Sequence, residues 1–96
     1  MAHYVVLGSF SEQGIRNIKE TAKRAQAFRE TAKQMGVTLK EIFWTLGHYD
    51  VIVTLDAPND EMVTALMMKV GSLGNLKSQT LRAFDEKEVQ SLLTKL

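Results

Sequence analysis

The segment around Gly47-His48 constrains the fold most, because polar and apolar residues alternate on both sides of this pair. Alternation with a period of two is typical of β-strands. A two-residue connection that begins with glycine matches a type II′ hairpin turn. The sequence therefore predicts two strands, residues 37–46 and 49–56, that pair in a β-hairpin.

The two faces of the predicted hairpin differ in polarity. One face carries Ile42, Trp44, Leu46, Tyr49, Val51, Val53 and Leu55, and the other carries Leu39, Glu41, Phe43, Thr45, Asp50, Ile52, Thr54 and Asp56. We expect helices to cover the apolar face, with Trp44 and Tyr49 packed into the core. A slip of one residue would exchange the two faces. The second face is called the mixed face below.

Two further strands are predicted outside the hairpin. Residues 3–10 are apolar on both faces, which is typical of a central strand covered on both sides. Gly8 within this strand indicates a bulge or a close approach of another backbone. Residues 75–84 mix apolar side chains with serine, glutamine and threonine, and this pattern favours a strand at the edge of the sheet.

Three helices are predicted from apolar spacing and capping residues. Over residues 12–35, apolar residues recur every three or four positions, so we expect one long helix capped by Ser11. A second helical segment that starts at Thr21 is the alternative. Pro58 and the acidic residues after it begin another helix, and Asp85 begins a short amphipathic helix at the end of the chain.

The predicted order is strand, helix, strand, strand, helix, strand, followed by the short terminal helix. This is the split βαβ order of a ferredoxin-like sandwich, an α+β fold in which helices cover one face of a four-stranded antiparallel sheet. A chain of 96 residues has the size of a single domain. We therefore assign residues 1–96 to one domain.

The mixed face is too apolar to leave in water and too polar for a dry core. A chain this small buries only about two-thirds of its unfolded surface. Burying a further 1,000 Å² of apolar area would contribute about 25 kcal/mol before the costs of association. We therefore expect a symmetric homodimer in which two sheets face each other around a partly polar cavity. The terminal helix packs either on the partner or on its own domain.

Composition excludes several classes of protein. The chain has 12 Lys and Arg against 11 Asp and Glu, so it lacks the basic surface of a general nucleic-acid binder. It has no cysteine, which excludes disulfides and thiolate metal sites. Its apolar runs are too short to span a membrane, and its first residues lack the layout of a signal peptide. We expect a soluble, cytoplasmic protein.

Five short blocks, in order along nearly the whole chain, are similar to one protein family. Gly47-His48-Tyr49-Asp50 resembles the signature after which the small bacterial GYD-domain family is named. The other blocks are Ser11-Glu12-Gln13-Gly14-Ile15-Arg16, Asp56-Ala57-Pro58, Gly71-Ser72-Leu73-Gly74-Asn75 and Thr80-Leu81-Arg82-Ala83-Phe84. The chain departs from the family in having His48 where an acidic residue is common, and Thr21-Ala22 where a proline is common. The resemblance implies a dimeric α/β-barrel domain without an established activity.

Asp50 is the main candidate for chemistry. It follows the predicted turn and shares the mixed face with Thr45. A carboxylate in a partly desolvated pocket acts as a general base or binds a polar ligand. In the alternative interpretation, Asp50 accepts backbone N–H groups and fixes the turn.

Four other residues are predicted to line the same cavity. Phe43 and Ile52 belong to the mixed face, and Tyr4 and Arg82 join them if the first and last strands present them inward. Arg82 in that position would attract an anionic ligand or pair with Asp50. The alternative is that Arg82 is a charge that protects an edge strand from aggregation.

His48 is the second catalytic candidate, because imidazole exchanges protons near neutral pH. Its place at an exposed turn argues against catalysis, which requires a shaped and desolvated setting. A metal site would require His3 or His48 to meet acidic residues of the mixed face, and the sequence has no His-x-x-x-His spacing. We therefore predict no metal and no other cofactor.

Three hypotheses for function follow. The main prediction is a small-molecule-binding protein that holds its ligand between the sheets of a homodimer, near Thr45, Asp50 and Arg82. The second is a cofactor-free enzyme of the isomerase or monooxygenase type with Asp50 as base, which rests on analogy of fold. The third is an assembly or regulatory module without a ligand. The sequence leaves open whether the protein is an enzyme.

Overall fold

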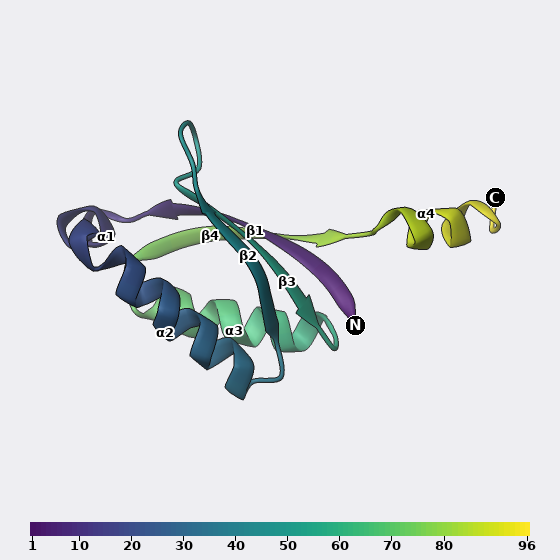
Figure 1. Ribbon diagram of the computed structural model, residues 1–96, viewed down its shortest axis with the longest axis horizontal. Helices are drawn as coiled ribbons and strands as arrows, with labels where there is room; N and C mark the ends of the chain where they lie inside the picture. The colour runs from purple at the N-terminus through teal and green to yellow at the C-terminus, as the bar shows by residue number, and fades with distance from the viewer.

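The computed structural model describes residues 1–96 and contains a four-stranded antiparallel sheet with the strand order β2-β3-β1-β4 (Figure 1). The elements are β1 (Ala2–Phe10), α1 (Glu12–Arg16), the 3₁₀ turn η1 (Ile18–Glu20), α2 (Thr21–Gln34), β2 (Thr38–Trp44), β3 (Val51–Ala57), α3 (Asp60–Ser72), β4 (Leu76–Ala83) and α4 (Glu86–Leu93). Helices α2 and α3 lie on one face of the sheet. The predicted α+β class and order of elements are confirmed.

Strand β1 is central, as predicted, because it pairs with both β3 and β4. Tyr4 and Val6 are buried in the core, and Val5 between them points to the opposite side of the sheet. Gly8 permits a close approach, since a Cβ there would lie 2.9 Å from Cγ1 of Val51. The neighbours of Gly8 are the side chains of Val51 and Leu76, and the pairing of β1 is regular there, so neither the predicted bulge nor the predicted approach of another backbone occurs.

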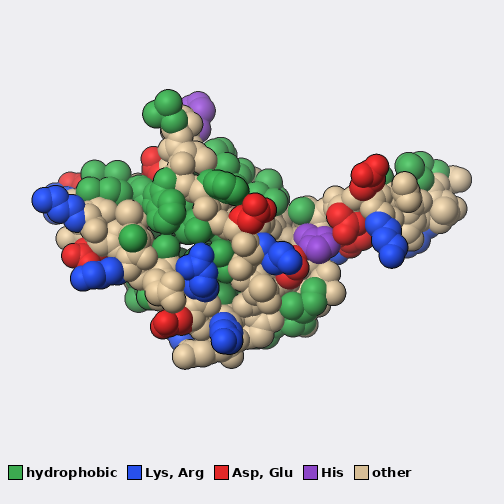
Figure 2. Space-filling view, in the orientation of Figure 1, with side chains coloured by type: hydrophobic (Ala, Val, Ile, Leu, Met, Phe, Trp, Pro, Cys, Tyr) green, Lys and Arg blue, Asp and Glu red, His purple; other side chains and the backbone are tan.

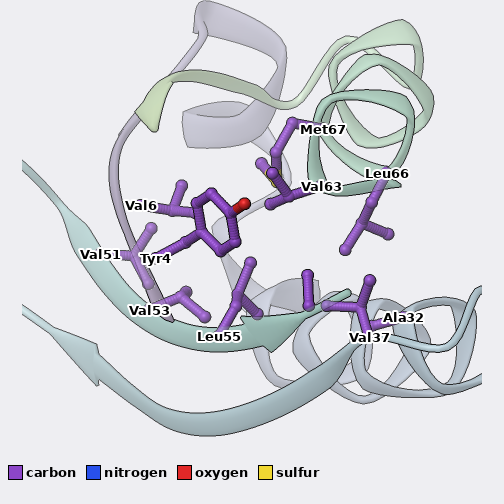
Figure 3. Packing of buried hydrophobic residues seen from close by; sticks show 11 residues of the cluster. Tyr4, Val6, Ala32, Val37, Val51, Val53, Leu55, Val63, Leu66 and Met67 are labelled. Atoms are coloured by element: carbon purple, nitrogen blue, oxygen red, sulfur yellow. The ribbon is translucent and has the colours of Figure 1, made fainter. Parts of the chain in front are cut away.

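The hydrophobic core lies between the sheet and the two helices (Figure 3). Strand β3 contributes every second residue, and α3 contributes residues three or four apart, so each element follows its own period. Each fully buried aliphatic side chain contributes about 1.5–3 kcal/mol. The core consists of Tyr4, Val6, Ala32, Val37, Val51, Val53, Leu55, Ala57, Val63, Leu66 and Met67.

The predicted register of the hairpin is confirmed beside its loop. Phe43 lies opposite Ile52, and Trp44 lies opposite Val51. The indole N–H of Trp44 donates a hydrogen bond to Oγ1 of Thr21 at the start of α2 (3.0 Å), so the apolar face does point to the helices. Trp44 is nevertheless 47% exposed. It therefore packs at the margin of the core and not inside it.

The predicted two-residue turn is wrong. The strands end earlier, and residues 45–50 form a longer loop between them. This loop closes where the N–H of Thr45 donates to the carbonyl of Asp50 (2.8 Å). Gly47 within it has a φ of +119°, a conformation that favours glycine.

Leu46 and Tyr49 are exposed, which corrects their expected place in the core. The 45–50 loop projects away from α2 and α3, so no helix lies beneath it (Figure 1). The alternating pattern continues into the loop, but the layer that would cover its apolar side ends before the loop begins.

A β-bulge moves Leu39 to the helix side of the sheet. The pairing of β2 with β3 shifts between Leu39 and Glu41, so that Leu39 lies opposite the buried Leu55. The extra residue, Lys40, reverses the side to which the residues before it point. The prediction that Leu39 belongs to the mixed face is therefore wrong, and this side chain packs against the core.

The predicted continuous helix over residues 12–35 is also wrong, and the alternative of a new segment at Thr21 is correct. Helix α1 ends before Asn17. The guanidinium group of Arg24 in α2 donates to the carbonyl groups of Asn17 (2.7 Å) and Gly14 (3.3 Å). These bonds satisfy carbonyl groups that the end of a helix leaves without partners, and so they stabilise the break.

The last three elements match their predictions. Asn59 caps α3 by accepting the N–H of Met62 (3.0 Å), β4 lies at the edge of the sheet, and Asp85 and Glu88 form a capping box at the start of α4. Helix α4 projects beyond the end of the sheet, and the molecule measures 49 × 30 × 18 Å (Figure 1). This direction contradicts packing of the terminal helix on its own domain.

Candidate functional site

The face of the sheet opposite α2 and α3 is called the outer face, and its composition follows from the register. It consists of His3, Val5, Leu7 and Ser9 on β1, Thr38, Glu41 and Phe43 on β2, Ile52, Thr54 and Asp56 on β3, and Lys77, Gln79, Leu81 and Ala83 on β4. Apolar, hydroxyl and charged side chains are mixed on it, as the sequence predicts. The two helices of the chain leave this face uncovered.

The outer face has apolar side chains exposed to solvent and a buried hydroxyl group without a hydrogen-bond partner. On the two edge strands, Phe43 is 54% exposed and Leu81 is 39% exposed. The hydroxyl oxygen of Thr54 is buried and has no hydrogen-bond partner. A buried hydroxyl without a partner costs about 1–3 kcal/mol. The outer face therefore offers both apolar area and an unsatisfied polar group to whatever covers it.

Asp50 anchors the 45–50 loop to the central strand. Its carboxylate Oδ2 accepts the backbone N–H of Phe10 (2.9 Å), and its own N–H donates to the carbonyl of Gly8 (2.8 Å). These contacts join the loop to β1, and the bond from Thr45 closes the loop on itself. The geometry agrees with the turn-fixing interpretation of Asp50. The second carboxylate oxygen, Oδ1, makes no hydrogen bond within the chain and is free to meet a ligand.

Four of the predicted ligand-binding residues lie close together. Phe43 and Ile52 are opposite each other in the sheet, and Thr45 and Asp50 are bonded to each other two positions closer to the loop tip. The hydroxyl of Thr45 donates to the carbonyl of Tyr49 (2.5 Å), so the loop already uses this donor. The group combines two apolar side chains with a hydroxyl and a carboxylate at one end of the outer face.

His48 lies apart from this group. Its side chain is exposed in the 45–50 loop, and no acidic residue forms an ion pair with it. Only its backbone carbonyl is engaged, as the acceptor of a hydrogen bond from the hydroxyl of Ser9 (3.3 Å). The imidazole thus lacks the desolvated setting and the orienting partner that proton transfer requires.

Tyr4 and Arg82 lie on the helix side, which corrects their predicted place beside Asp50. Tyr4 is 3% exposed, and its hydroxyl donates to Asp60 (2.5 Å). Burial is the main cause that raises the pKa of Tyr4, and the bond to Asp60 adds to it. Arg82 pairs with Tyr4 across the strands and stacks on Phe84, 4.3 Å from the ring centre. Paired residues share one side of a sheet, so both point away from the outer face.

The sequence offers no signal for a cavity of about 200 Å³ between the sheet and α2. Apolar side chains from two helices and all four strands form most of its wall, including Phe28, Trp44 and Met67. Thr21 and Arg24 add polar groups at its margin. This cavity depends on the distance between two layers, which periodicity does not report. We call it the helix-side cavity.

His3 connects the sheet to the start of α4. Its Nδ1 lies 2.6 Å from Oδ1 of Asp56. Its Nε2 lies 3.2 Å from Oδ2 of Asp85 and 3.4 Å from Oε1 of Glu88. The hydrogen bond to Asp56 is the main cause that raises the pKa of His3. The backbone N–H of Glu88 is the main cause that lowers the pKa of Asp85.

These groups are of the kind that bind divalent cations, and three of their atoms lie within 4.8 Å of one another. They already satisfy one another, however. Asp85 and Glu88 are engaged in the capping box, and Nη2 of Arg82 lies 3.7 Å from Oε2 of Glu88. A network of ion pairs that fixes the base of α4 accounts for the whole cluster.

The strand order, the two helices on one face and the open outer face define a small α+β sandwich of the ferredoxin-like class. The chain belongs to the GYD domain family, whose model matches residues 4–93. Among curated proteins, none matches the sequence.

Two crystal structures have a similar fold. The protein TTHA0845 from Thermus thermophilus is 21% identical, with 88% of this chain and 95% of that chain covered and a TM-score of 0.58. FFRP-DM1 is 17% identical, with 88% and 100% covered and a TM-score of 0.60. At these identities the likeness concerns the fold alone. None of the helices combines the length and hydrophobicity that crossing a membrane requires.

Proposed function

We propose that this protein is a small-molecule-binding homodimer whose outer faces pack against each other around a partly polar cavity. The observation that carries the proposal is the state of the outer face, where Phe43 and Leu81 are exposed and the hydroxyl of Thr54 has no partner. A second copy related by twofold symmetry brings an identical surface to this face. Such packing covers the apolar side chains and leaves the polar ones to line the remaining space.

The ligand proposed for this cavity has an apolar body and a hydrogen-bond donor. Phe43 and Ile52 provide apolar contacts, and the free Oδ1 of Asp50 provides an acceptor. Arg82 points to the helix side and does not reach the cavity, whereas Lys77 lies on the outer face. The proposal therefore specifies a hydrogen-bond donor on the ligand and leaves its net charge open.

The geometry supports binding over catalysis by Asp50. One carboxylate oxygen accepts the N–H of Phe10 and so serves the loop, which leaves only Oδ1 to meet a ligand. His48 lies outside the group and provides no proton relay. A cofactor-free enzyme with Asp50 as base remains the alternative function, and an assembly module without a ligand is the third.

The helix-side cavity supports a second location for the ligand, inside each chain. Its volume is about 200 Å³ and most of its wall is apolar. An apolar cavity of about 150 Å³ in another protein binds benzene, whereas pockets for drug-sized ligands measure about 300–1,000 Å³. This cavity therefore suits a single aromatic ring or a short branched alkyl group.

Thermal stabilisation by a library of small aromatic and heteroaromatic compounds tests the proposal. A ligand at 100 times its Kd stabilises the folded state by about 2.7 kcal/mol, which moves the melting temperature by about 10–20 °C in a domain of this size. Failure of every compound to raise the melting temperature would contradict small-molecule binding and favour the assembly module.

Two pairs of variants locate the ligand. Asp50→Asn tests the cavity between the outer faces, with Glu30→Gln at an exposed position of α2 as its matched control. Ala25→Leu fills the helix-side cavity, and Ala22→Leu makes the same change at an exposed position of α2. A ligand lost in Asp50→Asn and kept in Ala25→Leu supports the site between the sheets, and the reverse result assigns it to the helix-side cavity.

A further inference from the structure

Helix α4 is too short to be stable alone. It has eight residues, whereas isolated helices shorter than about 12–15 residues are marginal in water. The capping box of Asp85 and Glu88 helps, but a cap contributes only about 0.5–2 kcal/mol. Since α4 projects away from the sheet and from α2 and α3, its own domain does not provide the missing packing (Figure 1).

One side of α4 is apolar and uncovered. Four side chains spaced three or four residues apart form a stripe that the solvent reaches, and Leu93 within it is 57% exposed. Figure 2 shows hydrophobic side chains on this arm, and also at the end of the 45–50 loop. The stripe consists of Val89, Leu92 and Leu93 in α4 and of Leu96, three residues beyond the end of the helix.

The arm is held in a defined direction. His3 on the outer face contacts both Asp85 and Glu88 at the start of α4. From the other side, Arg82 approaches Glu88 (3.7 Å) and stacks on Phe84, the residue between β4 and the capping box. These contacts orient the apolar stripe relative to the sheet, so α4 is positioned by the fold and is not a free tail.

We propose that the apolar stripe of α4 docks on the outer face of a second copy of this chain, and that the second copy returns the same contact. This inference rests on the homodimer of the proposed function and adds the segment that completes it. The outer face and the stripe are both uncovered apolar surfaces, and twofold symmetry covers both in one assembly. Each copy then supplies part of the surface that closes the cavity of its partner.

The area that the two α4 contacts bury reaches the lower limit for a specific interface. A half-exposed aliphatic side chain presents about 60 Å², and the stripe covers an equal area on the face beneath it. Counted for both copies, the two α4 contacts bury about 1,000 Å², where specific interfaces begin. The packed outer faces add to this area.

The charges of α4 favour a protein surface over a membrane. Its polar side carries acidic Glu86 and Glu88 beside basic Lys87, so it lacks the excess of positive charge that draws amphipathic helices to anionic lipids. A second copy is the occupant that this balanced, short helix fits.

Dimer affinity measured by sedimentation on the full chain tests the docking of α4. Leu92→Asp with Leu93→Asp is expected to raise the dimer Kd at least about 100-fold, because each copy loses two apolar contacts and symmetry doubles the loss. Gln90→Asp with Ser91→Asp adds the same charge to the same helix away from the stripe, and is expected to change the Kd less than about threefold. Phe43→Asp reports separately on the outer face.

The outcomes separate the two proposals. Loss of affinity in both the stripe variant and Phe43→Asp supports the inference. An unchanged Kd in the stripe variant overturns the docking of α4 and leaves the homodimer of outer faces standing. Loss in the stripe variant with no change in Phe43→Asp overturns the outer face as the interface of the proposed function. A photo-crosslinker at position 92 checks the contact directly, because only docking on a second copy yields a product of twice the chain mass.

Discussion

Replacing Asp50 by alanine tests whether this residue anchors the loop or serves the ligand. In the structure its Oδ2 accepts the N–H of Phe10 at 2.9 Å, in a partly buried position. A hydrogen bond to a charged group contributes about 1.5–3 kcal/mol, and a neutral one about half of that. We therefore expect Asp50→Ala to lower the free energy of unfolding by about 2 kcal/mol. Asp50→Asn, which keeps an acceptor oxygen, should cost about 1 kcal/mol.

The measurement is thermal unfolding at one fixed protein concentration, since a dimer has a concentration-dependent melting temperature. A loss of about 2 kcal/mol corresponds to a decrease of about 8–16 °C for a domain of this size. Glu30→Ala removes the same charge from an exposed position of α2, away from the outer face, and should change stability by less than about 0.5 kcal/mol. If Asp50→Ala melts like the unmodified protein, the anchoring role is wrong and the carboxylate serves a ligand alone.

Three further predictions concern other parts of the fold. Gly14→Ala should lower the free energy of unfolding by more than about 2 kcal/mol, because the new Cβ would lie 2.2 Å from the carbonyl oxygen of Asn75. The loss is measured as a lower midpoint in urea, and an unchanged midpoint would show that α1 does not contact the segment before β4. Tyr4→Phe should cost about 1 kcal/mol, measured by the same unfolding, through loss of the bond to Asp60, and no loss would contradict that bond. Folding raises the pKa of His3, so protonated His3 stabilises the folded state fully at pH values below its ordinary pKa of about 6.5, and this stabilisation is lost as the pH rises through the folded pKa. The unfolding midpoints of the unmodified protein and of His3→Gln should therefore converge at high pH. A difference between them that grows with pH would contradict the raised pKa.

The parts of the fold that depend on local patterns are predictable from the sequence. The pairing of Phe43 with Ile52 follows from alternation, because one slipped residue would bury the wrong face. The caps at Asn59 and Asp85 follow from side chains that satisfy free N–H groups of a helix start. The mixture of polar and apolar side chains on the outer face likewise follows from the alternation along the strands.

The parts that depend on contacts between distant segments are not predictable in this way. The bulge that turns Leu39 inward leaves no mark on the alternating pattern. The break before Thr21 is stabilised by Arg24, whose bonds to the end of α1 exist only once the chain has turned. For Tyr4, the alternation along the strand shows which residues share its face of the sheet, but it does not show which of the two faces the helices cover. For this reason the pattern places Tyr4 and Arg82 on the wrong face.

Both proposals depend on a second copy covering the outer face and the stripe of α4, and the mass of the unmodified chain in solution measures this directly. Sedimentation equilibrium at about 10–100 µM, the range that detects a micromolar Kd, is predicted to give twice the mass of the chain. A single-chain mass throughout that range would contradict the account.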